Sequence, residues 1–455
     1  MAWQETDRKG VFSRPIGENE TFIKLVGDAG LPLNREHWAI NSSATVIPTG
    51  SAQAGLASRF RQAWTHLRFQ HPSLAAEVSP DDDTRFIYTV PADRAALDAW
   101  VSQTFNVAAD AESSADVIPT FRPTPYAKLV YVPRSGELLL HTAHWRTDGI
   151  GVLLLLDALL SLASAPGELA DPASLAWGTE ISRLAPAVED AACMPLEPTT
   201  AQQERATALA ATFSHSIGAI GIPCLGTTTA TPPGGTRSAA LAFSAPTTAE
   251  IIAVCKARGV SVTAAVHASV AGANYALADG ADKEKHYAST VRFALRAHLP
   301  EPAAAAGLYT TGWMKRVEAS TSWAERLCEY ADEYGKGVTR DFLDAHREYA
   351  RLLGELVRRG SEGGEASSEV DISSIGVAEK LIRRSYGTPE AGFEVRAVSV
   401  GVEILSRQAV AFVWTFRDRL NISVVYNEAF HSAGQMSRFV SVVRSELLEG
   451  LGVRL

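Results

Sequence analysis

An apolar run spans residues 150–163 and is interrupted by Asp157. A helix that crosses a bilayer needs about 20 apolar residues. The run is too short for that, so it predicts a helix buried inside a globular protein. The chain has 455 residues, 46% of them hydrophobic and 20% charged, which is the balance of a protein with a large interior. Its charged N-terminus shows no secretory signal, and we expect a cytoplasmic protein.

Two β-prone segments come before the predicted helix. They span residues 126–132 and 137–145, and the turn-forming sequence Pro-Arg-Ser-Gly lies between them at 133–136. This pattern predicts a hairpin whose second strand leads into the helix. His144 is therefore expected where a strand gives way to a loop, which is a common location for catalytic groups.

The rest of the chain predicts two halves of similar plan. Residues 171–236 are rich in Ala, Pro, Thr and Gly, with one helical stretch at 201–213, and are interpreted as a crossover. We expect an α/β fold with an N-terminal half at 1–170 and a C-terminal half at 237–455. Helices are predicted at 247–258, 262–276, 320–359 (one or two) and 432–449, strands at 287–295, 370–374, 397–404, 409–416 and 420–426, and a mobile loop at 361–368.

Composition and motifs argue against several classes of protein. The net charge of −9, without a long basic tract, makes nucleic acid a poor partner. The four cysteines lack the spacing of a metal or redox site, so no metal is expected; they are Cys193, Cys224, Cys255 and Cys328. No G-x-S-x-G elbow, Walker lysine loop or H-E-x-x-H pair is present, which argues against a hydrolase triad, a nucleotidase and a zinc peptidase. Direct group transfer through a general base is the simplest remaining chemistry.

The stretch His144-Trp-Arg-Thr-Asp148-Gly149 supplies a candidate base. An alcohol attacks a thioester slowly near neutral pH because it is almost wholly protonated, and a positioned base with a pKa near 7 speeds the attack. His144 fits that role, although a satisfied core histidine is the simpler alternative. Asp148 either orients the imidazole or turns away to pair with an arginine or cap the helix, with Gly149 easing the turn. The spacing leaves both roles open. His141 lies on the opposite face of the strand and is predicted to be structural.

This motif resembles the H-x-x-x-D-G signature of the superfamily that includes chloramphenicol acetyltransferase, plant BAHD enzymes and peptide-synthetase condensation domains. The chain most resembles fungal O-acyltransferases of secondary metabolism, of the trichothecene O-acetyltransferase kind. The order of three further stretches supports the resemblance: residues 295–300, 371–376 and 420–430. The resemblance implies two chloramphenicol-acetyltransferase-like α/β halves around a central tunnel.

The same resemblance implies a function. His144 would deprotonate an acceptor hydroxyl or amine, which attacks an acyl-CoA thioester, acetyl-CoA above all, without a covalent acyl-enzyme. Asp148 would pair with an arginine of the second half, for which Arg296 matches best and Arg292 is the reserve. The expected partners are acyl-CoA and a bulky hydroxylated metabolite such as a terpenoid or alkaloid. We expect a monomer without a metal, a nucleic-acid partner or a membrane span.

Some assignments stay open at this point. The chain lacks the D-F-G-W-G stretch of plant BAHD enzymes and has only residues 386–388 and Phe393 nearby, so the wall of the donor channel is unassigned. Alternatives within the fold are amide formation, a carrier-protein-bound acyl donor and cyclisation, and a third class is a non-enzymatic metabolite binder. The donor that would stabilise an oxyanion is open among Thr310, Thr311, Trp313 and Ser374.

Overall fold

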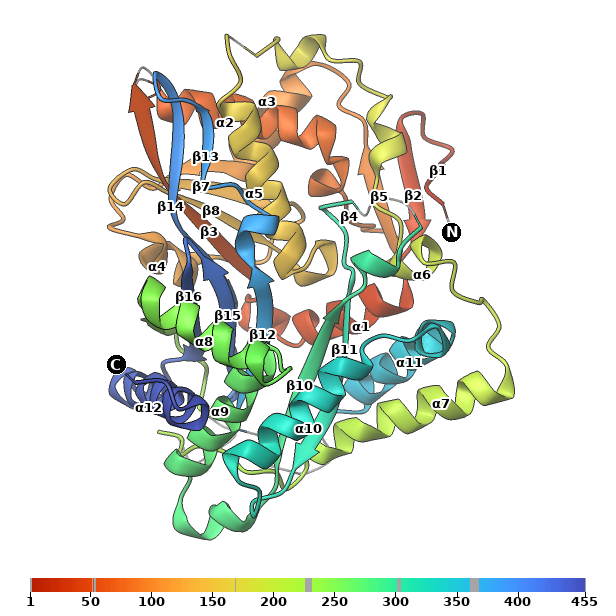
Figure 1. The fold of residues 1–455 in the computed structure, drawn as a ribbon. Coiled ribbons are helices and arrows are strands. Elements are labelled where there is room, and N and C mark those ends of the chain that lie inside the picture. Colours follow the sequence, from red (N-terminus) through yellow and green to blue (C-terminus); the bar gives the residue numbers. More distant parts are fainter. Residues whose placement is uncertain are drawn as a thin grey trace. The chain divides into compact units, whose positions relative to one another are not determined.

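The computed structural model describes residues 2–50, 52, 55–167, 169–225, 231–300, 304–360 and 368–454. Its helices and strands confirm the α/β class (Figure 1). Contacts divide the chain into unit 1, residues 1–197, 294–309 and 379–403, and unit 2, residues 198–293, 310–378 and 404–455. The units therefore cut the chain at other places than 1–170, 171–236 and 237–455, because two later segments pack with the N-terminal residues. The domain bounds read from the sequence stay a prediction.

Unit 1 is built on a six-stranded sheet of order β13-β14-β3-β8-β7-β6. Helices α2 (Leu56–Gln70) and α5 (Gly149–Ala163) pack against each other, and α5 contacts the sheet (Figure 1). The three consecutive leucines of β8 at 138–140 and five leucines of α5 are at most 1% exposed, so this helix and sheet form the core of unit 1. The strands are β13 (Ser385–Thr388), β14 (Ala391–Val402), β3 (Ile40–Gly50), β8 (Glu137–Thr142), β7 (Lys128–Val132) and β6 (Phe105–Val107).

The predicted hairpin is confirmed, with one correction. Strands β7 and β8 pair antiparallel, and Gly136 in the turn has φ 68°. The second strand ends at Thr142 and does not reach residue 145. His144–Arg146 instead form a 3-10 turn, closed by a hydrogen bond from the Arg146 N–H to the Ala143 carbonyl (3.2 Å). The buried helix predicted at 150–163 is confirmed as α5.

Unit 1 also contains a second, smaller sheet that the sequence analysis did not predict. Its order is β1-β2-β5-β4, and it is followed in the chain by helix α3 (Arg94–Thr104). The strands are two to five residues long, too short for an alternating pattern to stand out. The elements are β1 (Gln4–Glu5), β2 (Val11–Pro15), β4 (Glu77–Val78) and β5 (Arg85–Thr89), with α1 (Glu18–Asp28), α4 (Ser114–Val117) and α6 (Val188–Ala191) in the same unit.

Unit 2 holds a four-stranded sheet of order β12-β15-β16-β9, in which β12 runs parallel to β15. Helices α9 (Val262–Leu277) and α12 (Ala433–Leu451) pack against each other and contact its strands, beside α8 (Ala245–Ala257) (Figure 1). The strands are β12 (Val370–Val377), β15 (Ala409–Phe416), β16 (Arg419–Asn427) and β9 (Thr236–Ala242). Among the described residues, no single helix is long and apolar enough to be a candidate membrane span; α8 and α9 reach that length only together, with a bend of 103°.

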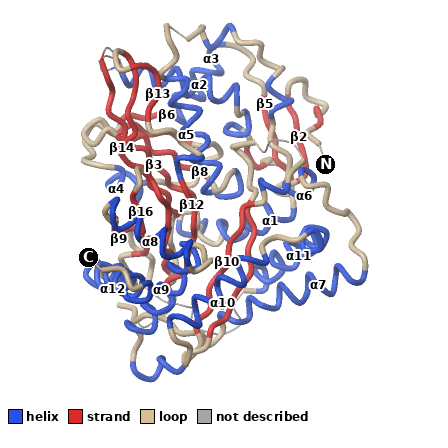
Figure 2. The backbone as a smooth tube through the Cα atoms, in the orientation of Figure 1, coloured by secondary structure: helices blue, strands red, loops and turns tan. Residues whose placement is uncertain are grey.

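The other part of unit 2 is a two-stranded ribbon, β10 (Tyr287–Ala294) and β11 (Thr310–Val317), with helices on it (Figure 2). Phe293 and Trp313 stack on the ribbon at 4.6 Å, and Phe342 packs on Trp313. The helices are α7 (Thr200–Ala211), α10 (Trp323–Lys336) and α11 (Arg340–Arg359), and α7 packs along α11. These elements confirm the helices predicted at 201–213 and 320–359. Most of the loop predicted at 361–368 lies outside the described residues.

Candidate active site

The motif loop joins β8 to α5 and is buried except at His144. Trp145, Arg146, Thr147 and Asp148 are at most 8% exposed, whereas the His144 side chain is intermediate. Four neighbours thus anchor the loop in the interior of unit 1, and the imidazole is the group of this loop that a substrate can reach. That is the arrangement a positioned general base requires.

Both carboxylate oxygens of Asp148 accept hydrogen bonds that fix the loop. Oδ1 accepts from the backbone N–H groups of Ile150 (3.1 Å) and Gly151 (2.9 Å), so Asp148 is the N-cap of α5. Oδ2 accepts from the backbone N–H of Tyr309 (2.8 Å). Of the two roles that the spacing left open, this geometry favours the one in which Asp148 fixes the loop.

Arg296 completes the surroundings of Asp148. Its Nη1 lies 2.7 and 2.6 Å from the two oxygens of Asp148, and Nη2 donates to the carbonyl of Gly307 (3.1 Å). The side chains of the pair are 13% and 5% exposed, so little solvent screens them. Arg292, the reserve, is instead paired with Asp371 in unit 2 (2.7 Å). The reserve assignment was therefore wrong.

Arg146 anchors the loop through four hydrogen bonds. It donates to the carbonyls of Ser73, Ala76 and Pro125 at 2.6 to 3.1 Å and to the hydroxyl of Thr142 at 2.7 Å. Burial lowers the pKa of Arg146 to about 10, which leaves it charged near neutral pH. No sequence pattern distinguishes Arg146, because its carbonyl partners are set by the tertiary fold.

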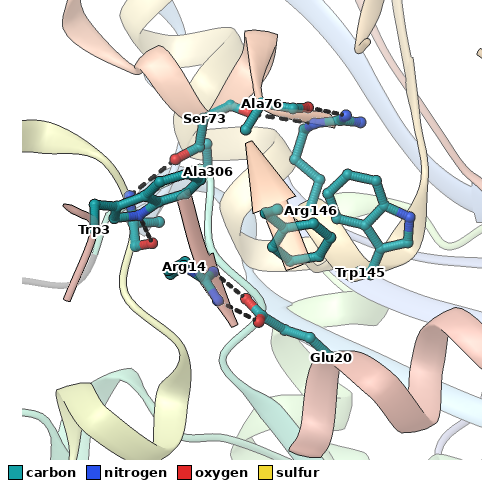
Figure 3. Close-up of a pocket in the computed structure, with 10 residues that line it drawn as sticks. Trp3, Arg14, Glu20, Ser73, Ala76, Trp145, Arg146 and Ala306 are labelled. Carbon is teal, nitrogen blue, oxygen red and sulfur yellow. Dashed lines mark hydrogen bonds and ion pairs between the residues drawn. The ribbon is translucent and has the colours of Figure 1, made fainter. Parts of the chain in front are cut away.

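A pocket lies beneath the loop and is lined by aromatic and charged side chains (Figure 3). Trp145 stacks on Phe86 at 4.4 Å, and the guanidinium of Arg14 lies 5.1 Å from the Phe86 ring. Arg14 also forms a buried, bidentate ion pair with Glu20. The lining residues are Trp3, Arg14, Glu20, Ser73, Ala76, Phe86, Trp145, Arg146, Ala185 and Ala306. These contacts tie the small N-terminal sheet to the motif loop.

Gly151 is the glycine on which the loop most depends. A Cβ there would lie 2.1 Å from Oγ1 of Thr147 and 2.2 Å from the carbonyl oxygen of Ala305. Those two oxygens are themselves joined by a hydrogen bond of 2.8 Å. Gly149, which the sequence analysis selected, begins α5. The close approach to residue 305 is at Gly151, for which the motif predicts no role.

Gly151→Ala is expected to destabilise unit 1 by about 3 kcal/mol and to lower activity, because backbone and side chain must both move to admit the methyl group. Chemical denaturation of the purified variant measures the loss. Gly434→Ala is the matched control, since it lies in the first turn of α12 with nothing within 4 Å of the added Cβ. Equal stability of the two variants would show that the loop tolerates displacement.

Trp38 lies beside His144, and Glu36 and His37 precede it in the chain. The rings of Trp38 and His144 lie 6.4 Å apart at 48°, and His37 lies 5.6 Å from Trp38. Burial lowers the pKa of His37 to about 4 and raises that of Glu36 to about 7. His37 is therefore neutral near pH 7. None of these residues was predicted from the sequence.

The other predicted candidates have structural partners. His141 is buried, bonds Asn41 through Nδ1 (2.9 Å) and stacks on Phe121, and burial lowers its pKa to about 3. This agrees with its predicted structural role. The four candidates for an oxyanion donor all lie in unit 2 and each has a partner: Thr310 with Phe293, Thr311 with His346, Trp313 with Glu333, and Ser374 with Thr263. No group of three metal-ligating side chains occurs among the described residues.

Comparison with known proteins decides the family. Acetyltransferase pigO of Monascus ruber is 40% identical over 461 residues, covering 100% of this chain and 99% of the relative. The chain belongs to the HxxxD acyltransferase superfamily. O-acetyltransferase pigM of the same organism is 28% identical to this acyltransferase, over 100% of this chain and 88% of the relative. No family model matches the sequence.

The fold of this HxxxD acyltransferase is also known. The trichothecene 15-O-acetyltransferase TRI3 of Fusarium sporotrichioides superposes with a TM-score of 0.82 at 18% identity, covering 100% of this chain and 98% of the other. At that identity the likeness shows the fold alone. It confirms the predicted chloramphenicol-acetyltransferase-like fold. The identity to pigO shows that the protein is an acyltransferase enzyme.

Proposed function

We propose that the protein is an acetyl-CoA-dependent O-acetyltransferase that acts on a hydroxyl of a bulky secondary metabolite, with His144 as general base. The observation that carries the proposal is the motif loop, in which four buried, anchored residues directly follow a partly exposed imidazole. The names of the relatives support both the group that is transferred and the atom that accepts it. PigO carries the name acetyltransferase, and pigM and TRI3 carry the name O-acetyltransferase.

The proposed reaction needs one base and no covalent enzyme intermediate. His144 takes the proton of the acceptor hydroxyl as its oxygen forms a bond to the thioester carbon, and the carbonyl electrons move to oxygen. The tetrahedral intermediate then expels the CoA thiolate, which receives the proton from His144, and the acetyl ester remains. Asp148 and Arg296 take no part in proton transfer; they fix the loop that carries the imidazole.

The remaining assignments of this proposal concern donor and location. Acetyl-CoA serves as a co-substrate, and the acceptor is a largely apolar alcohol such as a terpenoid or alkaloid. We place the enzyme in the cytoplasm, where acetyl-CoA is available, and as a monomer. The four cysteines are all free, which agrees with a reducing compartment.

The proposal is tested by measuring the release of CoA from acetyl-CoA by the purified protein. The acceptors are a panel of hydroxylated terpenoids and alkaloids and the matching amines. Alcohols are expected to release CoA and to yield an acetyl ester by mass spectrometry. The intact mass of the enzyme, with acetyl-CoA but no acceptor, is expected to stay unchanged. Transfer to amines alone, or from an acyl carrier protein but not from CoA, would contradict the proposed acceptor or donor; a stable acetyl-enzyme would contradict direct transfer.

A further inference from the structure

Trp38 has a strained backbone next to the proposed base. Its φ is 62°, in the left-handed region that bulky L-residues rarely occupy. Two backbone hydrogen bonds of 2.8 Å hold it there, from the Trp38 N–H to the Glu403 carbonyl and from the Glu403 N–H to the Ala39 carbonyl. Such strain costs about 1–3 kcal/mol and is concentrated at functional sites. The strained backbone of Trp38 therefore indicates that its side chain has a function.

The strained backbone places the indole beside His144. The two ring centroids are 6.4 Å apart, within the range of contacting aromatic pairs. Trp38 also packs on the cluster formed by Ile23, Phe86, Ala143, Trp145 and Leu308. Trp38 thus contacts both the imidazole and the hydrophobic cluster that supports the loop.

The indole N–H of Trp38 is buried and has no hydrogen-bond partner among the described residues. Leaving a buried donor unsatisfied costs about 1–3 kcal/mol. Trp38 as a whole residue keeps intermediate exposure although its N–H is buried. Donors of unoccupied sites commonly reach their final geometry only when substrate binds. Strain and an unused donor on one residue beside the base indicate a partner that comes with the substrate.

We propose that the N–H of Trp38 donates a hydrogen bond to the thioester carbonyl oxygen and stabilises it as it becomes an oxyanion. This role rests on the proposed acetyl transfer. When the acceptor oxygen bonds to the carbonyl carbon and His144 takes its proton, the carbonyl electron pair moves to the oxygen that faces Trp38. When the carbon–sulfur bond breaks, that pair re-forms the carbonyl and the hydrogen bond weakens. Trp38 is then a catalytic residue whose contact is strongest in the transition state.

The Trp38→Phe variant tests this role because it keeps an aromatic ring and removes the N–H. We expect its single-turnover rate of acetyl transfer to fall about 100-fold, the usual loss for one oxyanion donor. The KM values for acetyl-CoA and acceptor should stay within about threefold. The melting temperature should not fall, because the variant removes a donor that is unsatisfied in the free enzyme.

Trp100→Phe is the matched control. Its indole nitrogen is also buried without a partner among the described residues, and its ring stacks on Trp64, in a different part of unit 1 from the motif loop. It should keep both rate and melting temperature. Trp38→Gly is the second variant, since glycine adopts φ 62° without strain. It should fold and be at least as slow as Trp38→Phe.

Three results with an active wild type would overturn the role and leave the proposed function intact. Trp38→Phe could transfer acetyl groups at the wild-type rate, or it could raise the KM for the acceptor at an unchanged rate. Its melting temperature could also fall far enough to account for the lower activity. A folded wild type that transfers no acetyl group to any acceptor would overturn the proposed function and this role together. The wild-type measurement therefore separates the two failures.

Discussion

His144→Ala is expected to lower kcat/KM for acetyl transfer about 1000-fold, because the acceptor alcohol loses the base that removes its proton. The side chain is partly exposed and belongs to the first residue of a short turn, so its truncation should shift the melting temperature by only a few degrees. Initial rates at saturating acetyl-CoA, with calorimetry on the same preparation, measure both quantities.

His298→Ala is the control for this variant, since His298 is an exposed histidine of the same unit. It should keep full activity and stability. His144→Gln should be as slow as His144→Ala, because an amide of similar size has no basic nitrogen. Retained activity in a folded His144→Ala enzyme would show that another group takes the proton.

Asp148→Asn is expected to cost about 3–5 kcal/mol of folding free energy, because it leaves the buried guanidinium of Arg296 without its counter-charge. The new amide also has to place an NH2 group where Arg296 or the Tyr309 N–H now donates. Activity should fall with the loop's order. Urea denaturation gives the loss of stability, and rates at a temperature where the variant is folded give the loss of activity.

A double-mutant cycle separates the pair from its surroundings. Arg296→Met alone should be strongly destabilising, whereas the double variant should be less unstable than the sum of the two single variants, by more than about 1 kcal/mol. Glu112→Gln is the control, because the Arg134–Glu112 pair is at least half exposed and should contribute little. Additive losses at Asp148 and Arg296 would contradict their coupling.

The parts of the fold that the sequence predicted are those with strong local patterns. The β7–β8 hairpin follows from its turn residues and α5 from its apolar run, and both are confirmed. The end of β8 was predicted at residue 145 and lies at Thr142, because the β-prone pattern continues into the 3-10 turn that carries His144. The small N-terminal sheet was missed, since its strands are held by pairing and not by a pattern of their own.

The surroundings of His144 depend on contacts that no local pattern reveals. The role of Asp148 stayed open because its partner Arg296 lies 148 residues further along the chain. The conformation of Trp38 depends on Glu403, whose carboxylate pairs with Arg35 across 368 residues. The signal at Trp38 is the strain itself, and strain of this kind is visible only in a three-dimensional structure.

The proposed acetyl transfer from CoA to an alcohol depends on His144. The most direct test incubates radiolabelled acetyl-CoA and the hydroxylated panel with wild type and with folded His144→Ala at equal concentration, and follows label in the organic products. We predict labelled ester from wild type and about a thousandth of that rate from the variant. Equal labelling by the two proteins, or no labelled product from wild type with any acceptor, would contradict the claim.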